Sequence, residues 1–304
     1  MSNLLGNTVR GTGNMSFPAA VLVGCVIVHI AISPALIFGF GPLPALGPAG
    51  AGWGIVIPFA GGSAIMIWYL RSRAIVRLNF RGVTPRWELF ADILKVGVPG
   101  LINIAITNLS VVLLTGIACQ LGCDTALGYA LGARLEYILQ PIAFGFGTAI
   151  VAMVGTSWGA QQYRRAREIA WTGASTVALV CGTIGLIVAF QPALWIGLFS
   201  DDAEVARLGT LYLRIVGPAY LLFGLGLGLF YVTLGVGRAV AAMNANAVRM
   251  VASAAGGLVA MYWFDFGVAG FFAAVAAGFC LYAAMLVHAV SGVKTPNAEL
   301  ARTS

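Results

Sequence analysis

Charged residues are scarce in this chain of 304 residues: Asp, Glu, Lys and Arg together make up 9% of it, against about 25% in ordinary soluble domains. Hydrophobic residues make up 60%. A composition so poor in charge excludes a soluble globular domain and indicates a protein embedded in a bilayer. The formal net charge is nevertheless +7. Positive charge in a membrane protein is typical of cytoplasmic loops, so we expect no nucleic-acid partner.

Residues that carry enzyme or metal chemistry are also few, with two histidines and five cysteines. Cys119 and Cys123 stand four positions apart without a nearby histidine, so we expect packing thiols. The pattern shows no metal-ligand cluster and no nucleophile–base pair, and we expect no cofactor and no enzymatic activity. Glycine-rich stretches such as 224–228 have no strand before them, so they indicate close helix packing instead of a phosphate-binding loop.

Long apolar runs predict an all-α integral membrane protein with about eight transmembrane helices. The predicted spans are 16–40, 50–70, 95–120, 125–154, 169–192, 204–233, 244–264 and 268–290.

The connections between these spans alternate in charge. One set is basic and contains Arg10, Arg71, Arg73, Arg77, Arg81, Arg86, Lys95, Arg164, Arg165, Arg167, Arg238, Arg249, Lys294 and Arg302. The opposite set contains Asp124, Asp201, Asp202, Glu204 and Asp265, with Arg207 as the nearby positive charge. Because basic loops stay on the cytoplasmic side, we predict that both termini are cytoplasmic. We expect the plasma membrane, the inner membrane in a bacterium.

The chain contains an internal repeat. Gly-Thr-Gly at 11–13 corresponds to Gly-Val-Gly at 235–237, and the segments 46–50 and 266–270 share a Gly-X-Ala-Gly pattern. In each copy, the Gly-X-Gly motif precedes a pair of spans and the Gly-X-Ala-Gly motif lies in the loop that joins them. Both pairs begin on the cytoplasmic side and run in the same direction. Such copies imply two lobes related by an axis along the membrane normal, a recurrent plan in secondary transporters.

Several polar side chains lie at mid-membrane depth within the predicted spans. Arg134 and Glu136 lie roughly 14–17 Å from the Thr125 end of their helix, near the middle of a core ~30 Å thick. Ionisable groups at that depth cost at least ~2.5 kcal/mol each, so they usually face a bundle interior or a water-filled cavity. We therefore predict a substrate or cation pathway that contains Asn103, Thr107, Asn108, Arg134, Glu136, Gln140 and Arg214.

Helical spacing suggests how these side chains are arranged. Asn103, Thr107 and Ser110 should form one polar stripe with Asn108 turned away. Tyr129, Glu136 and Gln140 should share a face of their helix, on which Arg134 does not pair with Glu136.

Two roles are compatible with Glu136 in the sequence. Arg214 is a possible partner, so Glu136 belongs either to a buried structural ion pair or to a substrate or cation site. His29 also reaches mid-depth, and we expect a packed neutral histidine there in preference to a proton relay.

Three motifs in order resemble the MATE family, the multidrug and toxic compound extrusion antiporters. They are Arg-Gly-Thr-Gly-Asn at 10–14, Leu-Lys-Val-Gly-Val-Pro-Gly at 94–100, and Arg-Leu-Glu at 134–136 with Gly-Ala-Gln-Gln-Tyr-Arg-Arg-Ala at 159–166. The resemblance covers nearly the whole chain. It implies a fold with twelve spans in two lobes of six helices, of which this chain resembles the last two helices of the first lobe and a complete second lobe. Roughly four helices of that plan have no counterpart here.

The resemblance also implies boundaries. We expect a partial first lobe at 1–70, a basic interlobe linker on the cytoplasmic surface at 71–94, a six-helix lobe at 95–290 and a cytoplasmic tail at 291–304. Some members carry an acidic residue near the positions of Thr107 and Asn108, and no carboxylate stands there in this sequence.

Three functions follow as expectations. The first is an antiporter that exports organic, often cationic, compounds in exchange for Na+ or H+. The second is a flippase for a lipid-linked sugar, and the third is a membrane component that does not transport. The expected partners are membrane lipid, a small organic substrate, and either a second copy of the chain or a partner that supplies the absent helices, because a single partial lobe leaves a transport cavity without a wall.

Overall fold

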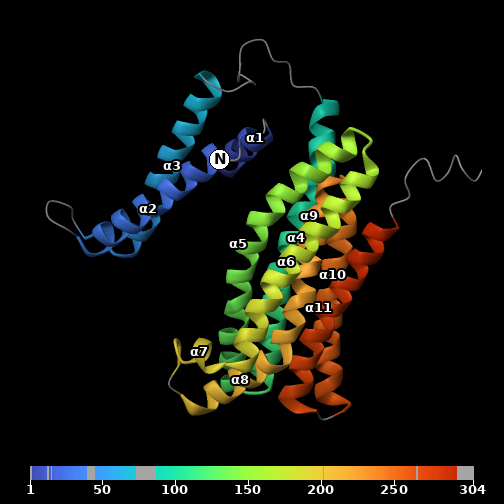
Figure 1. The fold of residues 1–304 in the computed structure, drawn as a ribbon. Helices are drawn as coiled ribbons and strands as arrows, with labels where there is room; N and C mark the ends of the chain where they lie inside the picture. The colour runs from blue at the N-terminus through green and yellow to red at the C-terminus, as the bar shows by residue number, and fades with distance from the viewer. Residues whose placement is uncertain are drawn as a thin grey trace, which may run out of the picture. The chain divides into compact units, whose positions relative to one another are not determined.

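The computed structural model describes residues 2–11, 14, 16–39, 45–72, 87–200, 202–264 and 266–292 (Figure 1). Throughout these residues the regular elements are helices, which confirms the predicted all-α fold. The chain divides into two compact units, Met1–Arg86 and Trp87–Ser304.

The first unit contains α1 (Ser2–Gly11), α2 (Ser16–Phe38) and α3 (Pro48–Ser72). Its small core joins Leu5 and Val9 of α1 to Met66 and Leu70 of α3. Most of the remaining apolar side chains of α2 and α3 are exposed, as expected for helices that face lipid.

Polar groups inside α2 are satisfied by the backbone of α3. The Nδ1 atom of His29 lies 2.8 Å from the carbonyl oxygen of Gly54 and donates to it, since a carbonyl can only accept. The thiol of Cys25 donates to the carbonyl oxygen of Pro58 at 3.3 Å. These contacts agree with a packed histidine that joins two helices.

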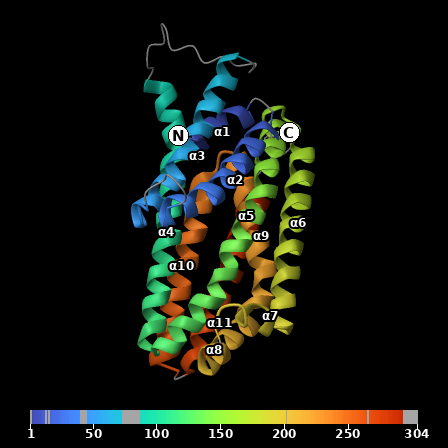
Figure 2. The same ribbon diagram turned by 90° about the vertical axis from the view of Figure 1, so that its left-hand side faces the viewer.

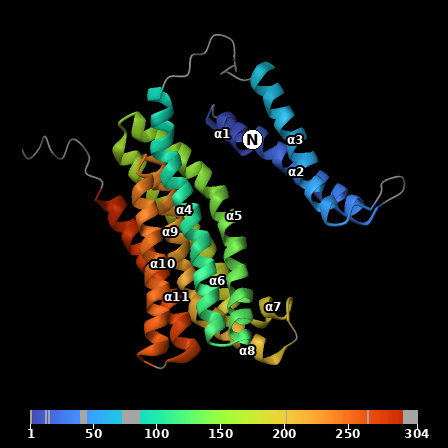
Figure 3. The same cartoon turned by 180° about the vertical axis from the view of Figure 1, so that it is seen from behind.

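The second unit is a helical bundle with two distinct ends. The connection between α5 and α6 lies at one end, whereas α7 and α8 lie at the other (Figures 2 and 3). Its elements are α4 (Trp87–Gln120), α5 (Cys123–Gly159), α6 (Tyr163–Phe190), α7 (Ala193–Ile196), α8 (Ala203–Val216), the 3₁₀ turn η1 (Gly217–Ala219), α9 (Tyr220–Gly235), α10 (Ala239–Tyr262) and α11 (Gly267–Ser291).

Seven helical segments of the described chain are long and apolar enough to cross a bilayer. One of them, Ala203–Gly235, combines α8, η1 and α9. The eighth predicted span, 244–264, exists as α10, whose 24 residues give a length of about 36 Å. Asn244, Asn246 and Arg249 make α10 less apolar than the other seven.

The boundary of the basic linker differs from the prediction of 71–94. Helix α3 continues to Ser72, and α4 begins at Trp87 instead of near residue 95. The exposed rings of Trp87 and Phe90 stack at 6.0 Å on this first part of α4. A search for apolar runs misses such a segment, because its alternating apolar and charged residues suit a membrane surface better than a span. The loop residues Arg73, Arg77, Arg81, Arg86, Asp201, Asp265, Lys294 and Arg302 lie outside the described residues.

Close packing of α6 against α9 confirms the expected role of the glycine-rich stretch 224–228. A Cβ atom added to Gly224 would lie 2.6 Å from the Cβ of Cys181, and one added to Gly228 would lie 2.6 Å from the Cα of Ala174. Only glycine fits at such distances, so these positions set the separation between the two helices.

The internal repeat is visible in the backbone. Helices α2 and α3 have 23 and 25 residues, and α10 and α11 have 24 and 25. The corresponding glycines Gly47 and Gly267 both adopt left-handed conformations, with φ of 55° and 56°. Residues with a Cβ avoid that region, so glycine is needed at the same place in both copies.

Candidate functional site

A cavity of about 510 Å³ lies within the second unit, between α4, α5, α9, α10 and α11. We call it the lobe cavity. Its walls are mostly apolar and aromatic, with polar side chains converging from α4, α5 and α10. The lining residues include Asn103, Thr107, Asn108, Ser110, Tyr129, Glu136, Gln140, Phe223, Tyr231, Asn246, Arg249, Ser253, Phe279 and Tyr282.

Asn246 of α10 ties that helix to α4. Its side-chain nitrogen donates to the carbonyl oxygen and to Oδ1 of Asn103, at 3.2 and 3.0 Å, and to Oγ1 of Thr107 at 2.8 Å. Only 5% of Asn246 is exposed. Because an unsatisfied buried amide would be costly, this cluster fixes the register between the two helices.

Arg249 extends the same network toward the aromatic wall. Its Nε donates to Oδ1 of Asn246 at 3.0 Å. Its guanidinium carbon lies 5.6 Å from the centre of the Phe279 ring and 5.9 Å from that of Tyr282. Cation–π contacts of this kind stabilise a guanidinium that lies away from bulk water.

Glu136 is the carboxylate of the lobe cavity. The hydroxyl of Tyr212, on α8, donates to its Oε1 at 3.0 Å. Arg249 lines the same cavity as Glu136, although the described residues form no ion pair between them. The carboxylate therefore shares a cavity with a positive charge and is held by a neutral donor.

Five of the seven residues predicted for the pathway line the lobe cavity: Asn103, Thr107, Asn108, Glu136 and Gln140. Tyr129 also lines the cavity, beside Glu136 and Gln140, in agreement with the prediction that these three residues share one face of their helix. Asn108 also borders the cavity, and its amide donates to the carbonyl of Ile104 at 2.9 Å without joining the cluster that Asn246 forms with Asn103 and Thr107.

The two arginines predicted for the pathway, Arg134 and Arg214, do not line the lobe cavity. Arg134 is exposed and its guanidinium lies 5.3 Å from the centre of the Phe199 ring. Arg214 is also exposed, so the alternative of a Glu136–Arg214 ion pair is wrong within the described structure. Depth along a helix gave the height of both residues, whereas their direction around the bundle depends on neighbouring helices.

Sequence reasoning missed Asn246 and Arg249. Arg249 was assigned to a basic loop, but α10 begins at Ala239 and carries Arg249 in its interior. A signal for both residues was present: Asn246, Arg249 and Ser253 follow the i, i+3, i+7 spacing of one helix face, and all three line the cavity. Arg249 was overlooked because a positive charge near a predicted helix end resembles a loop residue.

The described residues contain no group of three His, Cys, Asp or Glu side chains that could hold a metal ion. All five cysteines are free, with Cys25 and Cys181 buried and the others exposed. The polar chemistry of the lobe cavity therefore rests on one carboxylate, one guanidinium, amides and hydroxyls.

The profile of the MatE family matches residues 99–259, which run from α4 to α10. The chain belongs to the MatE family. The matched residues include the α4, α5, α9 and α10 walls of the lobe cavity.

Curated relatives match about 70% of the chain. YoeA of Bacillus subtilis, a probable multidrug resistance protein, is 26% identical over 221 residues, which cover 71% of this chain and 48% of that protein. NorM of Thermotoga maritima, also a probable multidrug resistance protein, is 25% identical over 69% of this chain and 45% of its own length. An FAD transporter of Shewanella oneidensis is 22% identical over 71% and 48%. The chain thus spans about half the length of these relatives.

Solved structures share the fold. A MATE transporter in complex with MaL6 matches with a TM-score of 0.87 at 16% identity, over 95% of this chain and 66% of that chain. A Vibrio cholerae MATE transporter matches with a TM-score of 0.85 at 19% identity, over 97% and 67%. A MOP superfamily transporter from Pyrococcus furiosus matches with a TM-score of 0.86 at 17% identity, over 94% and 64%.

Proposed function

We propose that this chain acts in a MATE-type secondary antiporter that exports organic, often cationic, compounds in exchange for Na+ or H+. The observation that carries the proposal is the position of Glu136. It is a carboxylate in a largely apolar and aromatic cavity, inside the lobe of a MatE-family protein.

The lobe cavity suits an organic cation in size and chemistry. Its volume of about 510 Å³ lies within the 300–1,000 Å³ usual for small-molecule sites. Aromatic rings such as those of Tyr129, Phe223 and Tyr231 attract cations through their faces. Glu136 supplies the negative charge that a cationic substrate requires.

Exchange follows from competition for Glu136. A proton or Na+ that reaches this carboxylate cancels its charge, and a cationic substrate then loses its main electrostatic partner. Arg249, held by Asn246 and the rings of Phe279 and Tyr282, balances Glu136 when neither ion is bound. Coupling ion and substrate would therefore occupy the cavity in turn, as an antiporter requires.

The names of the relatives favour this function over the alternatives. They include multidrug resistance and export proteins and an FAD transporter, and none of these names mentions a lipid-linked sugar. The function requires no covalent chemistry, in line with the expectation that the protein is not an enzyme.

The proposed orientation places the basic end of the second unit in the cytoplasm of a plasma membrane, the inner membrane in a bacterium. Arg165, near the α5–α6 connection, supports this through the positive-inside rule, and Glu204 of α8 lies at the opposite end. In a background without native cysteines, Arg165→Cys should resist an impermeant thiol reagent in intact cells, and Glu204→Cys should react. Labelling of position 165 alone would reverse the orientation.

A transport cycle also needs a second lobe against which this one moves. We propose that a second copy of the chain or a partner lobe fills this role. Crosslinking in native membranes should trap such a complex. Gradient-driven efflux by purified, monomeric protein in liposomes would contradict the proposal.

The central test is efflux of a fluorescent organic cation such as ethidium from cells that express the chain. We expect Glu136→Gln to reduce gradient-driven efflux to background while the protein stays folded and abundant in the membrane. The matched control is Glu168→Gln, which removes an exposed carboxylate paired with Arg164 at 3.0 Å. Unchanged efflux in Glu136→Gln would reject the proposed role of this carboxylate.

A further inference from the structure

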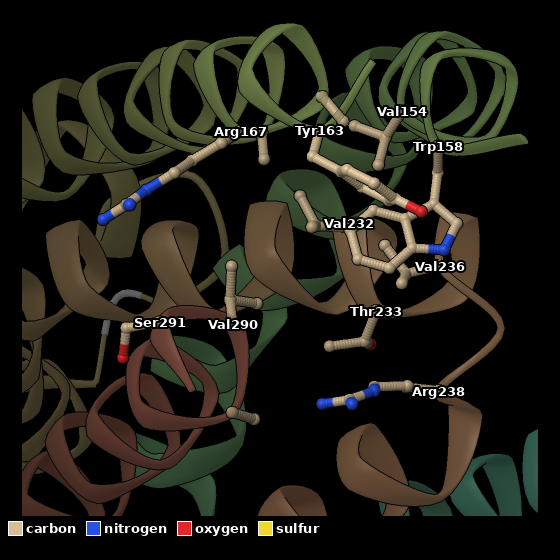
Figure 4. Close-up of a pocket in the computed structure, with 13 residues that line it drawn as sticks. Val154, Trp158, Tyr163, Arg167, Val232, Thr233, Val236, Arg238, Val290 and Ser291 are labelled. Atoms are coloured by element: carbon tan, nitrogen blue, oxygen red, sulfur yellow. The ribbon is translucent and has the colours of Figure 1, made fainter. Parts of the chain in front are cut away.

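A second cavity of about 220 Å³ lies at the end of the second unit where α5, α6, α9 and α11 meet (Figure 4). We call it the end cavity. It shares no lining residue with the lobe cavity. Its walls are formed by Val154, Trp158, Tyr163, Ala166, Arg167, Ala170, Val232, Thr233, Val236, Arg238, Ala289, Val290 and Ser291.

The end cavity carries two positive charges and no lining carboxylate. Arg167 of α6 and Arg238, between α9 and α10, make no ion pair and no side-chain hydrogen bond within the described residues. The nearest acidic residue in sequence, Glu168, is already paired with Arg164. Figure 4 shows both guanidinium groups extending toward the side of the cavity where Ser291 lies.

The rest of the cavity is apolar and aromatic. The rings of Trp158 and Tyr163 pack edge to face, with centres 4.8 Å apart, beside Val154 and Val236 (Figure 4). A Trp–Tyr pair next to basic residues is typical of the membrane–water interface. One side of the cavity therefore suits an anion, and the other suits an apolar chain.

We propose that the end cavity binds a phosphate carried on an apolar tail, in the first place the headgroup of an anionic phospholipid. Arg167 and Arg238 would hold the phosphate, since the planar guanidinium donates two parallel hydrogen bonds to it. The valine wall would receive the start of an acyl chain. This site is separate from the proposed transport pathway and does not depend on it.

The test is binding of lipids to the purified protein in detergent, read as the shift in thermal unfolding temperature. The probes are a short-chain phosphatidylglycerol, a phosphatidylcholine of equal chain length, and inorganic phosphate. The variant Arg167→Gln/Arg238→Gln is compared with Arg165→Gln, which removes a charge from the same surface without touching the end cavity and leaves Arg164 paired with Glu168.

We expect phosphatidylglycerol to stabilise the wild type and the control, and to bind about 30-fold more weakly to the Arg167→Gln/Arg238→Gln variant. Arg167→Lys/Arg238→Lys keeps the charge without the planar fork, so it should bind with intermediate affinity. If inorganic phosphate raised the unfolding temperature as much as phosphatidylglycerol does, the site would bind soluble phosphate compounds, and the proposed lipid ligand would be wrong. The proposal would be overturned if phosphatidylcholine raised the unfolding temperature as much as phosphatidylglycerol does. It would also be overturned if the control variant lost as much affinity for phosphatidylglycerol as the Arg167→Gln/Arg238→Gln variant.

Discussion

The helix pairs α2–α3 and α10–α11 share the repeated glycine motif and nearly equal lengths, but they direct their polar side chains to different targets. In α2, His29 and Cys25 bond to backbone carbonyls of the neighbouring α3. In α10, Asn246 and Arg249 reach α4 and the lobe cavity.

Corresponding positions make the contrast direct. Cys25 and Arg249 stand equally far after Gly13 and Gly237 in the two copies of the motif. At this position, α2 has a cysteine that bonds to the other helix of its own pair, whereas α10 has an arginine that lines the lobe cavity. The same backbone plan serves a structural role in one copy and a candidate functional role in the other.

The largest expected difference concerns transport. We expect Arg249→Gln to slow organic-cation efflux about 30-fold, the equivalent of ~2 kcal/mol of coupling, because Glu136 then loses the positive charge that balances it when neither ion is bound. Cys25→Ser, at the corresponding position of α2, should change the initial rate less than twofold. Equal effects on efflux from liposomes or cells would remove the functional contrast between the pairs.

The second difference concerns stability. Asn246→Leu removes the donor that bonds Asn103 and Thr107, and we expect it to lower the free energy of unfolding by about 2 kcal/mol. Asn244→Leu, at an exposed position of the same helix, should change it by less than ~0.5 kcal/mol. Unfolding in mixed micelles measures both, and equal values would show that the network contributes no net stability.

A third measurement tests what the pairs have in common. Gly47→Ala and Gly267→Ala each force a Cβ into the left-handed region, at a cost of about 1–2 kcal/mol. Because both glycines have the same φ, we expect equal losses of amide hydrogen-exchange protection in the first turns of α3 and α11. A loss in only one of them would mean that the two copies share a backbone conformation but that this conformation does not contribute equally to their stability.

The smallest effect is expected for His29. His29→Leu removes one hydrogen bond to the carbonyl of Gly54 and should lower the free energy of unfolding by about 1 kcal/mol. The pH dependence of efflux should stay that of the wild type, because a packed histidine takes no part in coupling. A shifted pH profile would instead identify His29 as a proton relay.

The sequence by itself determined the membrane class, the helices and the repeat. Apolar runs longer than a bilayer's thickness can satisfy their backbone groups only as helices, whatever their surroundings. Helical periodicity likewise placed Asn103 and Thr107 on one face and Glu136 and Gln140 on another, because the spacing of one helix follows from its own backbone.

Only the tertiary structure decided which helix faces meet. Arg214 lies at a depth similar to that of Glu136, but the side chain that bonds this carboxylate is Tyr212, two positions away on the same helix. Arg249 enters the cavity because Asn246 locks α10 against α4. Height in the membrane is a property of one helix, whereas the direction of a side chain around the bundle depends on how neighbouring helices pack, which no single segment encodes.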